Sequence, residues 1–375
     1  GHTENINHYV SEALNEKQGL VNNSNRQTSN GFNENSLNLK LIYRKKFKKV
    51  GRTIAANVEQ KSEDRNSDGF LNVLSDFYSE TGVVSLRDTI NQQKFNKSRL
   101  FTFNGKITYT EPLIKDHYLI LNYGLSNTIS RADRTTYDYA DGKYDVLNPL
   151  LTNNYDFIII TNAGGISYRI AKKKLNLTFG SDLASQSYTQ ADKIINSSLH
   201  YNRINLFPQT RIIYKFKPQT ILTFNYNGRT QQPTIQQIQP IPENTDPLNI
   251  YIGNPNLSAA FDHNLRLYFN DYKVLKARGI FVNANFVITD HAITTNNFVD
   301  KFGRRVTQSM NSAGTYNYYS YLGYQIQVPS IKTWFYGNVG NNGGKYINFV
   351  NSEENIIRNN RYSAYFSGSF RREEK

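Results

Sequence analysis

Apolar and polar residues alternate along most of this chain with a period of two, and no other feature limits the fold so strongly. In Leu37–Tyr43 the odd positions are apolar, while Asn38 and Lys40 lie between them. Phe101–Tyr109 and Leu119–Leu125 repeat the pattern. Because successive side chains of a β-strand point to opposite faces, the alternation predicts strands with one apolar and one polar face.

These strands are predicted to come in pairs. About twelve of them form six hairpins, with further strands expected at either end of the chain. Short turns are expected near Lys48–Gly51, Glu111–Asp116, Lys172–Lys174, Lys217–Thr220, Tyr272–Lys276 and Pro329–Lys332. The connections at the opposite end are predicted to be loops of roughly 10–35 residues. They include Glu63–Lys97, Arg131–Tyr155 and Thr230–Phe261.

Short turns at one end, long loops at the other and strands of about 10 residues are typical of a transmembrane β-barrel. A soluble β-sandwich or propeller also alternates apolar and polar residues, but its strands usually have about 5–6 residues. The polar positions carry Asn, Thr, Lys, Arg and Gln, as a hydrated lumen requires. Many of the 27 Tyr and 22 Phe residues stand at strand ends, where aromatic girdles lie in such barrels. The predicted fold is all-β, a transmembrane antiparallel up-and-down β-barrel, and a partial one of about 12–14 strands.

The composition excludes several other classes of protein. The mean hydropathy is −0.61, and the longest apolar runs, such as Phe157–Ile160, are far shorter than the roughly 20 residues of a membrane-spanning helix. The absence of Cys excludes disulfides, thiolate metal sites and cysteine nucleophiles. Gly1–Gly19 lacks the features of a signal peptide, so either the protein is cytoplasmic or its natural N-terminus lies upstream.

No motif predicts an enzyme, a cofactor site or a metal site. The six His residues are scattered without metal-ligand spacing, and no Gly-x-Ser-x-Gly nucleophile motif occurs. Asp64–Gly69 resembles the start of a calcium loop, but Ser75 stands at the twelfth position, where a Glu ligand is needed. Many of the basic residues behind the net charge of +14 lie at the short turns. We interpret them as solvated and interfacial side chains, and expect no nucleic-acid partner.

Several segments carry a resemblance to a known family. Tyr226–Ile235 and Pro247–Leu257, the second ending in Gly-Asn-Pro-Asn-Leu, are similar to a strand and loop of TonB-dependent-receptor-like barrels of the Bacteroidota outer-membrane β-barrel family. Lys45–Thr53 and Tyr109–Leu113 resemble periplasmic turns of that family. Ser258–Phe261 departs from it, because family members usually have a Lys-Pro-Glu-like stretch at this point.

The resemblance, which covers residues 36–372, implies a place in the outer membrane of a Gram-negative bacterium and a barrel of about 22 strands. Residues 1–35 would then be a first strand and extracellular loop region, and residues 36–375 a barrel segment truncated at both ends. It also implies partners for the full-length protein: outer-membrane lipid, a plug domain, a TonB-type energy-coupling protein and an unknown nutrient ligand. The expected function is uptake of a bulky nutrient. The alternative is a structural or binding barrel that serves as a surface scaffold or as a secretion or adhesion component. A plug and a TonB-contacting segment upstream of Gly1 would separate the two hypotheses.

Contacts with a ligand or a plug are predicted on the polar face and in one loop. Five Arg residues alternate with outward apolar residues and are therefore expected to point inward: Arg169, Arg203, Arg211, Arg229 and Arg266. They would contact a plug or an anionic ligand, or else brace the barrel wall through salt bridges and hydrogen bonds. The loop Pro233–Pro255, with Pro240, Pro242 and Tyr251, is either a ligand-contacting extracellular segment or a merely rigid loop.

Overall fold

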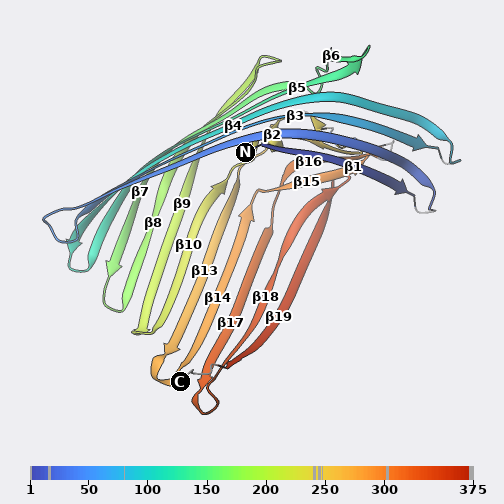
Figure 1. Ribbon diagram of the computed structural model, residues 1–375. Helices are drawn as coiled ribbons and strands as arrows, with labels where there is room; N and C mark the ends of the chain where they lie inside the picture. Colours follow the sequence, from blue (N-terminus) through green and yellow to red (C-terminus); the bar gives the residue numbers. More distant parts are fainter. Residues whose placement is uncertain are drawn as a thin grey trace.

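A single β-sheet makes up most of the chain. The computed structural model describes residues 2–15, 18–79, 81–239, 242–243, 246, 248–300 and 304–370. In these residues 19 strands belong to one sheet, which curls into an open wall (Figure 1). The predicted all-β, up-and-down architecture is confirmed.

Fourteen strands of the described chain form the wall, and thirteen antiparallel pairings join each to the next. In order across the sheet they are β1 (His2–Leu14), β2 (Leu20–Lys46), β3 (Thr53–Tyr78), β4 (Val84–Ile114), β5 (His117–Ala140), β7 (Asn153–Ala171), β8 (Leu175–Asp192), β9 (Ser197–Lys217), β10 (Thr220–Gln231), β13 (Ala260–Lys273), β14 (Arg278–Asp290), β17 (Thr315–Val328), β18 (Thr333–Val350) and β19 (Glu353–Phe370). In this part of the chain β1 and β19 share no backbone pair, so the wall is open. β2 runs across the expected division between residues 35 and 36, which stays a prediction.

The short turns lie along one edge of the sheet, from the left to the bottom of Figure 1. They join β2 to β3, β4 to β5, β7 to β8, β9 to β10, β13 to β14 and β17 to β18, at the six places that the sequence predicts. The last two contain the short 3₁₀ helices η1 (Val274–Lys276) and η2 (Pro329–Ile331). We call these six turns the short-turn rim.

The opposite edge differs from the prediction, because the first strands continue where a loop was expected. β2, β3 and β4 have 27, 26 and 31 residues. The segment Glu63–Lys97 was wrongly expected to be a loop, since it is a paired hairpin that turns only between Tyr78 and Val84. Its strands carry polar residues on both faces, so the alternation that marks a half-buried strand is missing. A bilayer crossing needs only about 9–11 residues, and these strands therefore extend far beyond the membrane.

Smaller elements fill the connections at this edge. β6 (Lys143–Leu147) pairs antiparallel with the end of β5, within the connection expected at Arg131–Tyr155. Between β10 and β13 lie α1 (Ile235–Ile238), β11 (Pro242–Glu243) and β12 (Asn249–Ile252). Between β14 and β17 lie β15 (Ala292–Val299) and β16 (Arg305–Ser312), and β16 pairs in parallel with β12. Among the described residues, no helix is long and apolar enough to cross a membrane.

The two faces of the wall differ as the alternation predicts. Directly paired residues share a face, and Tyr109 pairs with Leu121, which pairs in turn with Ile166. This outer face carries all six residues expected to point outward: Phe101, Phe103, Leu119, Leu121, Leu222 and Phe224. In the described residues no second sheet covers it, and apolar side chains such as Ile204 remain 74% exposed. A broad exposed apolar face is unfavourable in water and matches the hydrocarbon of a bilayer.

Candidate functional site

The inner face of the wall, opposite the apolar one, is polar. One row of directly paired residues crosses five neighbouring strands in the order Arg169, Thr178, Arg211, Asn225 and Arg266. Three arginines therefore alternate with uncharged polar residues at the same height of the wall. Neighbouring strands lie about 4.8 Å apart, so the guanidinium groups start from backbones about 10 Å apart.

The predicted inward orientation of all five arginines agrees with the register, but their contacts differ. Arg229 forms an ion pair with Asp262, with 3.3 Å between Nε and Oδ2. Arg169 donates a hydrogen bond to Asn176 Oδ1 over 3.2 Å, and Arg203 lies 5.9 Å from the centre of the Tyr201 ring. In the described part of the chain neither Arg211 nor Arg266 forms an ion pair, although both are exposed.

A hollow of about 520 Å³ lies on the inner face over strands β2 to β8, and we call it hollow A. Its wall combines charges of both signs, including Lys40, Glu59, Lys106 and Asp182. Lys106 Nζ lies 3.6 Å from Asp182 Oδ2, and the Asn122 amide donates to Asp182 Oδ1 over 3.1 Å. Exposed pairs of this kind organise a wet surface rather than stabilise the fold strongly.

The connection between β10 and β13, residues 232–259, folds inward onto this face. Ile238 of α1 is fully buried in a cluster with Phe157, Tyr188 and Leu257, and Tyr155 and Ile159 complete the cluster. A capping box caps the N-terminus of α1. The Thr234 side chain accepts from the backbone N–H of Gln237, while the Gln237 side chain accepts from the backbone N–H of Thr234. Tyr188 lies beyond the roughly ten residues that would cross the bilayer from the short-turn rim. Its burial in the cluster raises the pKa of Tyr188 to about 12.

The far half of this connection is held by contacts with other strands. Tyr251 lies on β12, and its hydroxyl is 2.5 Å from Ser309 Oγ on β16. Asp246 forms an ion pair with Arg26 of β2, with 2.7 Å between Asp246 Oδ2 and Arg26 Nη1. A side chain at Gly253 would collide with the carbonyl oxygen of Gln239, since its Cβ would lie 2.2 Å away. The connection is therefore a packed part of the wall's interior.

Of the two prolines predicted as contacts, only Pro242 lies within the described residues. Pro242 belongs to β11, where its backbone pairs with Ile252. Pro240 lies outside the described residues.

A second hollow of about 540 Å³, hollow B, lies between the connection and the inner wall. It is lined by Arg65, Arg131 and Phe157 from the wall, and by Gln232 and Ile235 from the connection. Gln232 Nε2 donates to the Tyr188 hydroxyl over 2.7 Å, whereas its buried Oε1 has no hydrogen-bond partner among the residues that the structure describes. An unpaired buried acceptor costs free energy and is ready to accept a donor from a ligand or a water molecule.

Sequence reasoning missed Gln232 and Tyr188 as parts of this site, and it did not predict that Ile238, inside the loop Pro233–Pro255, is buried. A signal was present at Phe157–Ile160, where four apolar residues follow each other and the alternation stops. Such a run indicates a strand that is covered on both faces. Here α1 covers the inner face of this run, on which Phe157 and Ile159 lie.

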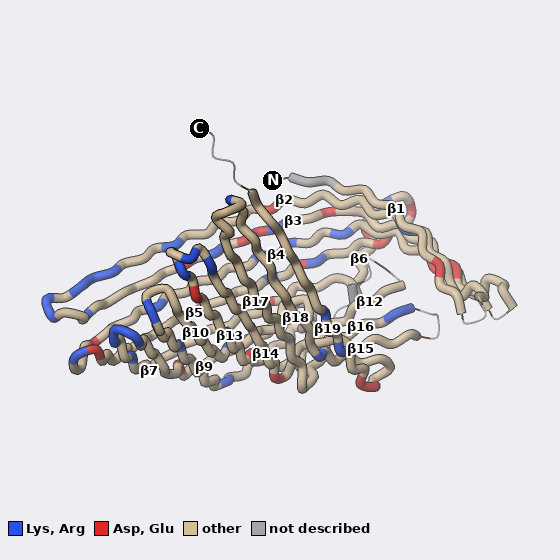
Figure 2. Tube along the Cα trace, turned by 90° about the horizontal axis from the view of Figure 1, so that it is seen from below, with Lys and Arg blue, Asp and Glu red and all other residues tan. Residues whose placement is uncertain are grey.

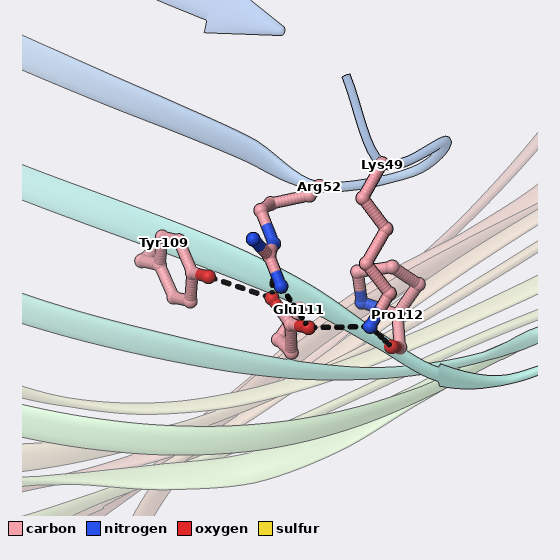
Figure 3. A network of polar contacts seen from close by, with 5 residues as sticks. All are labelled: Lys49, Arg52, Tyr109, Glu111 and Pro112. Atoms are coloured by element: carbon pink, nitrogen blue, oxygen red, sulfur yellow. Dashed lines mark hydrogen bonds and ion pairs between the residues drawn. The ribbon is translucent and has the colours of Figure 1, made fainter. Parts of the chain in front are cut away.

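A third polar cluster lies at the short-turn rim, on the turn side of Tyr109 (Figure 3). Glu111 accepts from Arg52 Nε over 2.7 Å and Nη2 over 2.8 Å, and from Lys49 Nζ over 2.6 Å. The Tyr109 hydroxyl donates a further bond over 2.6 Å. Arg52, then Lys49 and Tyr109, hold the pKa of the Glu111 carboxyl well below its usual range. The cluster joins the β2–β3 turn to β4.

The arrangement supports binding chemistry. Among the described residues no group of three or more His, Asp or Glu side chains could hold a metal ion. Within the described part of the chain the inner face instead offers two arginines without an ion-pair partner, several amides and a packed connection, which are the elements of a reversible binding surface.

Comparisons with known proteins agree with this description of the fold. The model of the outer membrane protein beta-barrel family matches residues 45–374. No curated protein matches the chain.

Solved structures were also compared. The FrpB iron transporter from Neisseria meningitidis (F3-3 variant) has 10% identity and a TM-score of 0.43, over 92% of this chain and 57% of that protein. A double mutant of the Serratia marcescens hemophore receptor HasR, in complex with its hemophore HasA and heme, has 11% identity and a TM-score of 0.46, over 92% and 59%. The alcaligin outer membrane receptor FauA from Bordetella pertussis has 10% identity and a TM-score of 0.40, over 95% and 65%. The chain thus spans less than two thirds of the length of each of these proteins.

Proposed function

The chain belongs to the outer membrane protein beta-barrel family, and its place is the outer membrane. We therefore propose that it forms the barrel wall of a TonB-dependent-receptor-like transporter that takes up a bulky nutrient. In this proposal the apolar outer face contacts outer-membrane lipid, and the inner face contacts a plug and the nutrient. The bacterial group proposed from the sequence resemblance is the Bacteroidota.

One observation carries the proposal, namely the pair of exposed inward arginines that have no ion-pair partner among the described residues. Arg211 and Arg266 flank Asn225 on the inner face and stand ready for an anionic group. Structural arginines are normally paired with carboxylates, as Arg229 is with Asp262. Arg203, over the Tyr201 ring, extends the same surface toward the connection. Arg169, over the Tyr118 ring, extends it toward the short-turn rim.

The connection of residues 232–259 is the proposed nutrient-contacting segment. Gln232 lines hollow B, and Tyr251 lies on β12 beside β16, with the Pro240 and Pro242 region between them in sequence. Both lie toward the end of the wall opposite the short-turn rim. That end faces the outside of the cell if the short turns are periplasmic, as they are in bacterial outer-membrane barrels.

The experiment uses the complete gene product. Its binding to the periplasmic domain of the TonB-type protein from the same organism is measured by calorimetry, with an outer-membrane porin of that organism as the control. We expect stoichiometric binding to the complete protein and none to the porin. Absence of binding, together with a complete sequence that lacks a plug, would contradict the transport proposal.

A second function is favoured by one observation, the length of β2, β3 and β4 beyond the membrane. Strands of 26 to 31 residues build a paired sheet outside the bilayer that a simple transporter wall does not require. Such a sheet would suit a surface scaffold or an adhesion or secretion component. This alternative is favoured if deletion of the gene leaves uptake of every tested nutrient unchanged but lowers attachment of cells to a surface.

A further inference from the structure

The short-turn rim combines exposed lysines with exposed apolar side chains at nearly every turn. Five of its six turns show the combination. The apolar members are Phe47 and Val50, Leu113 and Ile114, Phe216, Val274 and Leu275, and Ile331. Their neighbouring exposed lysines are Lys48, Lys115, Lys215 with Lys217, Lys276 and Lys332. The remaining turn has three consecutive exposed lysines, Lys172–Lys174.

The rim has a large excess of positive charge, as the blue tips of the turns in Figure 2 show. Its carboxylates are few in the described part of the chain, and two of them are engaged. Glu111 already binds Lys49 and Arg52, and Asp271 accepts from Thr220 and lies 3.9 Å from Lys273. Among the described residues, positive charge therefore exceeds negative charge along this curved line of turns.

Side chains of these two kinds fit the boundary between hydrocarbon and headgroups. Apolar side chains at the turns, such as Val50, which is 92% exposed, gain free energy by leaving water. Lysines beside them can extend their ammonium groups to phosphates while their methylene chains remain in the apolar layer. If the short turns face the periplasm, the rim meets the phospholipid leaflet of the outer membrane.

We propose that the short-turn rim is a binding site for the phosphate headgroups of anionic phospholipids in the periplasmic leaflet. A nucleic acid fits less well, because the lysines are distributed over separate turns beside apolar side chains instead of forming one flat basic surface. A protein partner would have to follow the same curve and is treated as an outcome of the test.

The test measures which lipids stay bound to the complete protein. The protein is placed in nanodiscs of phosphatidylethanolamine with about one fifth phosphatidylglycerol, and the retained lipids are counted by native mass spectrometry. Wild type should retain phosphatidylglycerol above its share of the mixture. Lys172→Gln combined with Lys173→Gln should lower this enrichment at least about threefold, since each lysine near an anionic surface contributes to binding.

The matched control is Lys97→Gln combined with Lys143→Gln, which removes two exposed lysines away from the rim. It should leave the enrichment unchanged, and 0.5 M salt should weaken the enrichment in wild type because the attraction is electrostatic. Equal losses in both double variants, or no enrichment in wild type, would overturn the proposal. Loss of a co-purifying acidic protein from the rim variant, with unchanged lipid composition, would overturn it as well and assign the rim to protein docking.

Discussion

At the scale of single residues, Glu111 shows how one carboxylate can hold a turn in place. It binds two cations and a hydroxyl that come from the β2–β3 turn and from its own strand. Because the pKa of Glu111 is lowered in the folded protein, its contribution to stability is complete above the ordinary carboxyl pKa of 4.5. That contribution is lost as the pH falls from there toward the lowered value.

We predict that Glu111→Gln loosens the β2–β3 turn at neutral pH. The neutral amide cannot replace a carboxylate that accepts from Arg52 and Lys49 together. Amide exchange at Phe47 and Arg52, whose backbone bond closes the turn, should become faster than in wild type at pH 7. The difference should shrink at pH values well below 4.5, where protonation removes the charge in wild type too. Glu353→Gln, at the exposed start of β19 on the other edge, is the control and should have no effect on the β2–β3 turn.

Two adjacent residues test the assignment of the faces. Leu121 points outward and is 42% exposed, while Asn122 points inward and bonds to Asp182. Leu121→Arg should destabilise the full-length barrel by about 2–4 kcal/mol, because a charge would enter hydrocarbon. Asn122→Arg should cost much less, since water and Asp182 can accommodate the charge. Reversible unfolding in a lipid bilayer measures both values, and equal costs would contradict the membrane orientation of this sheet.

At the scale of elements, the wall and its short turns could be predicted, but the long connections could not. The alternation in Phe101–Tyr109 and the polar turn Lys172–Lys174 are local signals, and both appear in the structure as expected. The hairpin between Glu63 and Lys97 buries every second residue from Leu71 to Phe77, but Phe70 and Leu74 on its other face are apolar too, so the sequence shows no simple alternation. The position of α1 depends on its contacts with β7 and β8, which are distant in sequence. The alternation in the sequence predicted that the five arginines point inward. It could not predict which of them form an ion pair with a carboxylate.

The connection of residues 232–259 is predicted to depend on Ile238. Replacing this fully buried residue by Ala should destabilise the docked connection by about 2–5 kcal/mol, because it removes the centre of the cluster with Phe157 and Tyr188. Hydrogen exchange within residues 232–259 should increase while exchange in β7 and β8 away from the cluster stays the same. Gln236→Ala changes an exposed neighbour in the same helix and should leave the exchange as in wild type. Faster exchange throughout the wall would mean that the connection is not a separate unit.

At the scale of the whole molecule, the two edges of the sheet are predicted to face opposite compartments. A short epitope inserted after Gly142, in the exposed turn between β5 and β6, should bind antibody on intact cells. The same epitope inserted after Lys173 should bind only after the outer membrane is permeabilised, because the short turns lie on the periplasmic side. The reverse pattern would invert the molecule and would also remove the basis for phospholipid binding at the rim.

The order of pairing in the wall has a consequence for how the molecule assembles. Each wall strand pairs with the wall strand that precedes it and the one that follows it in the chain. Hairpins can therefore be added one after another at a growing edge, and no addition closes a loop longer than residues 232–259, which limits the entropic cost of each step. The parallel pairing of β12 with β16 is different, because its two strands lie more than fifty residues apart in the chain. That contact can form only after β13 and β14 are in place, so docking of the inward connection is expected to be among the last and slowest steps of folding.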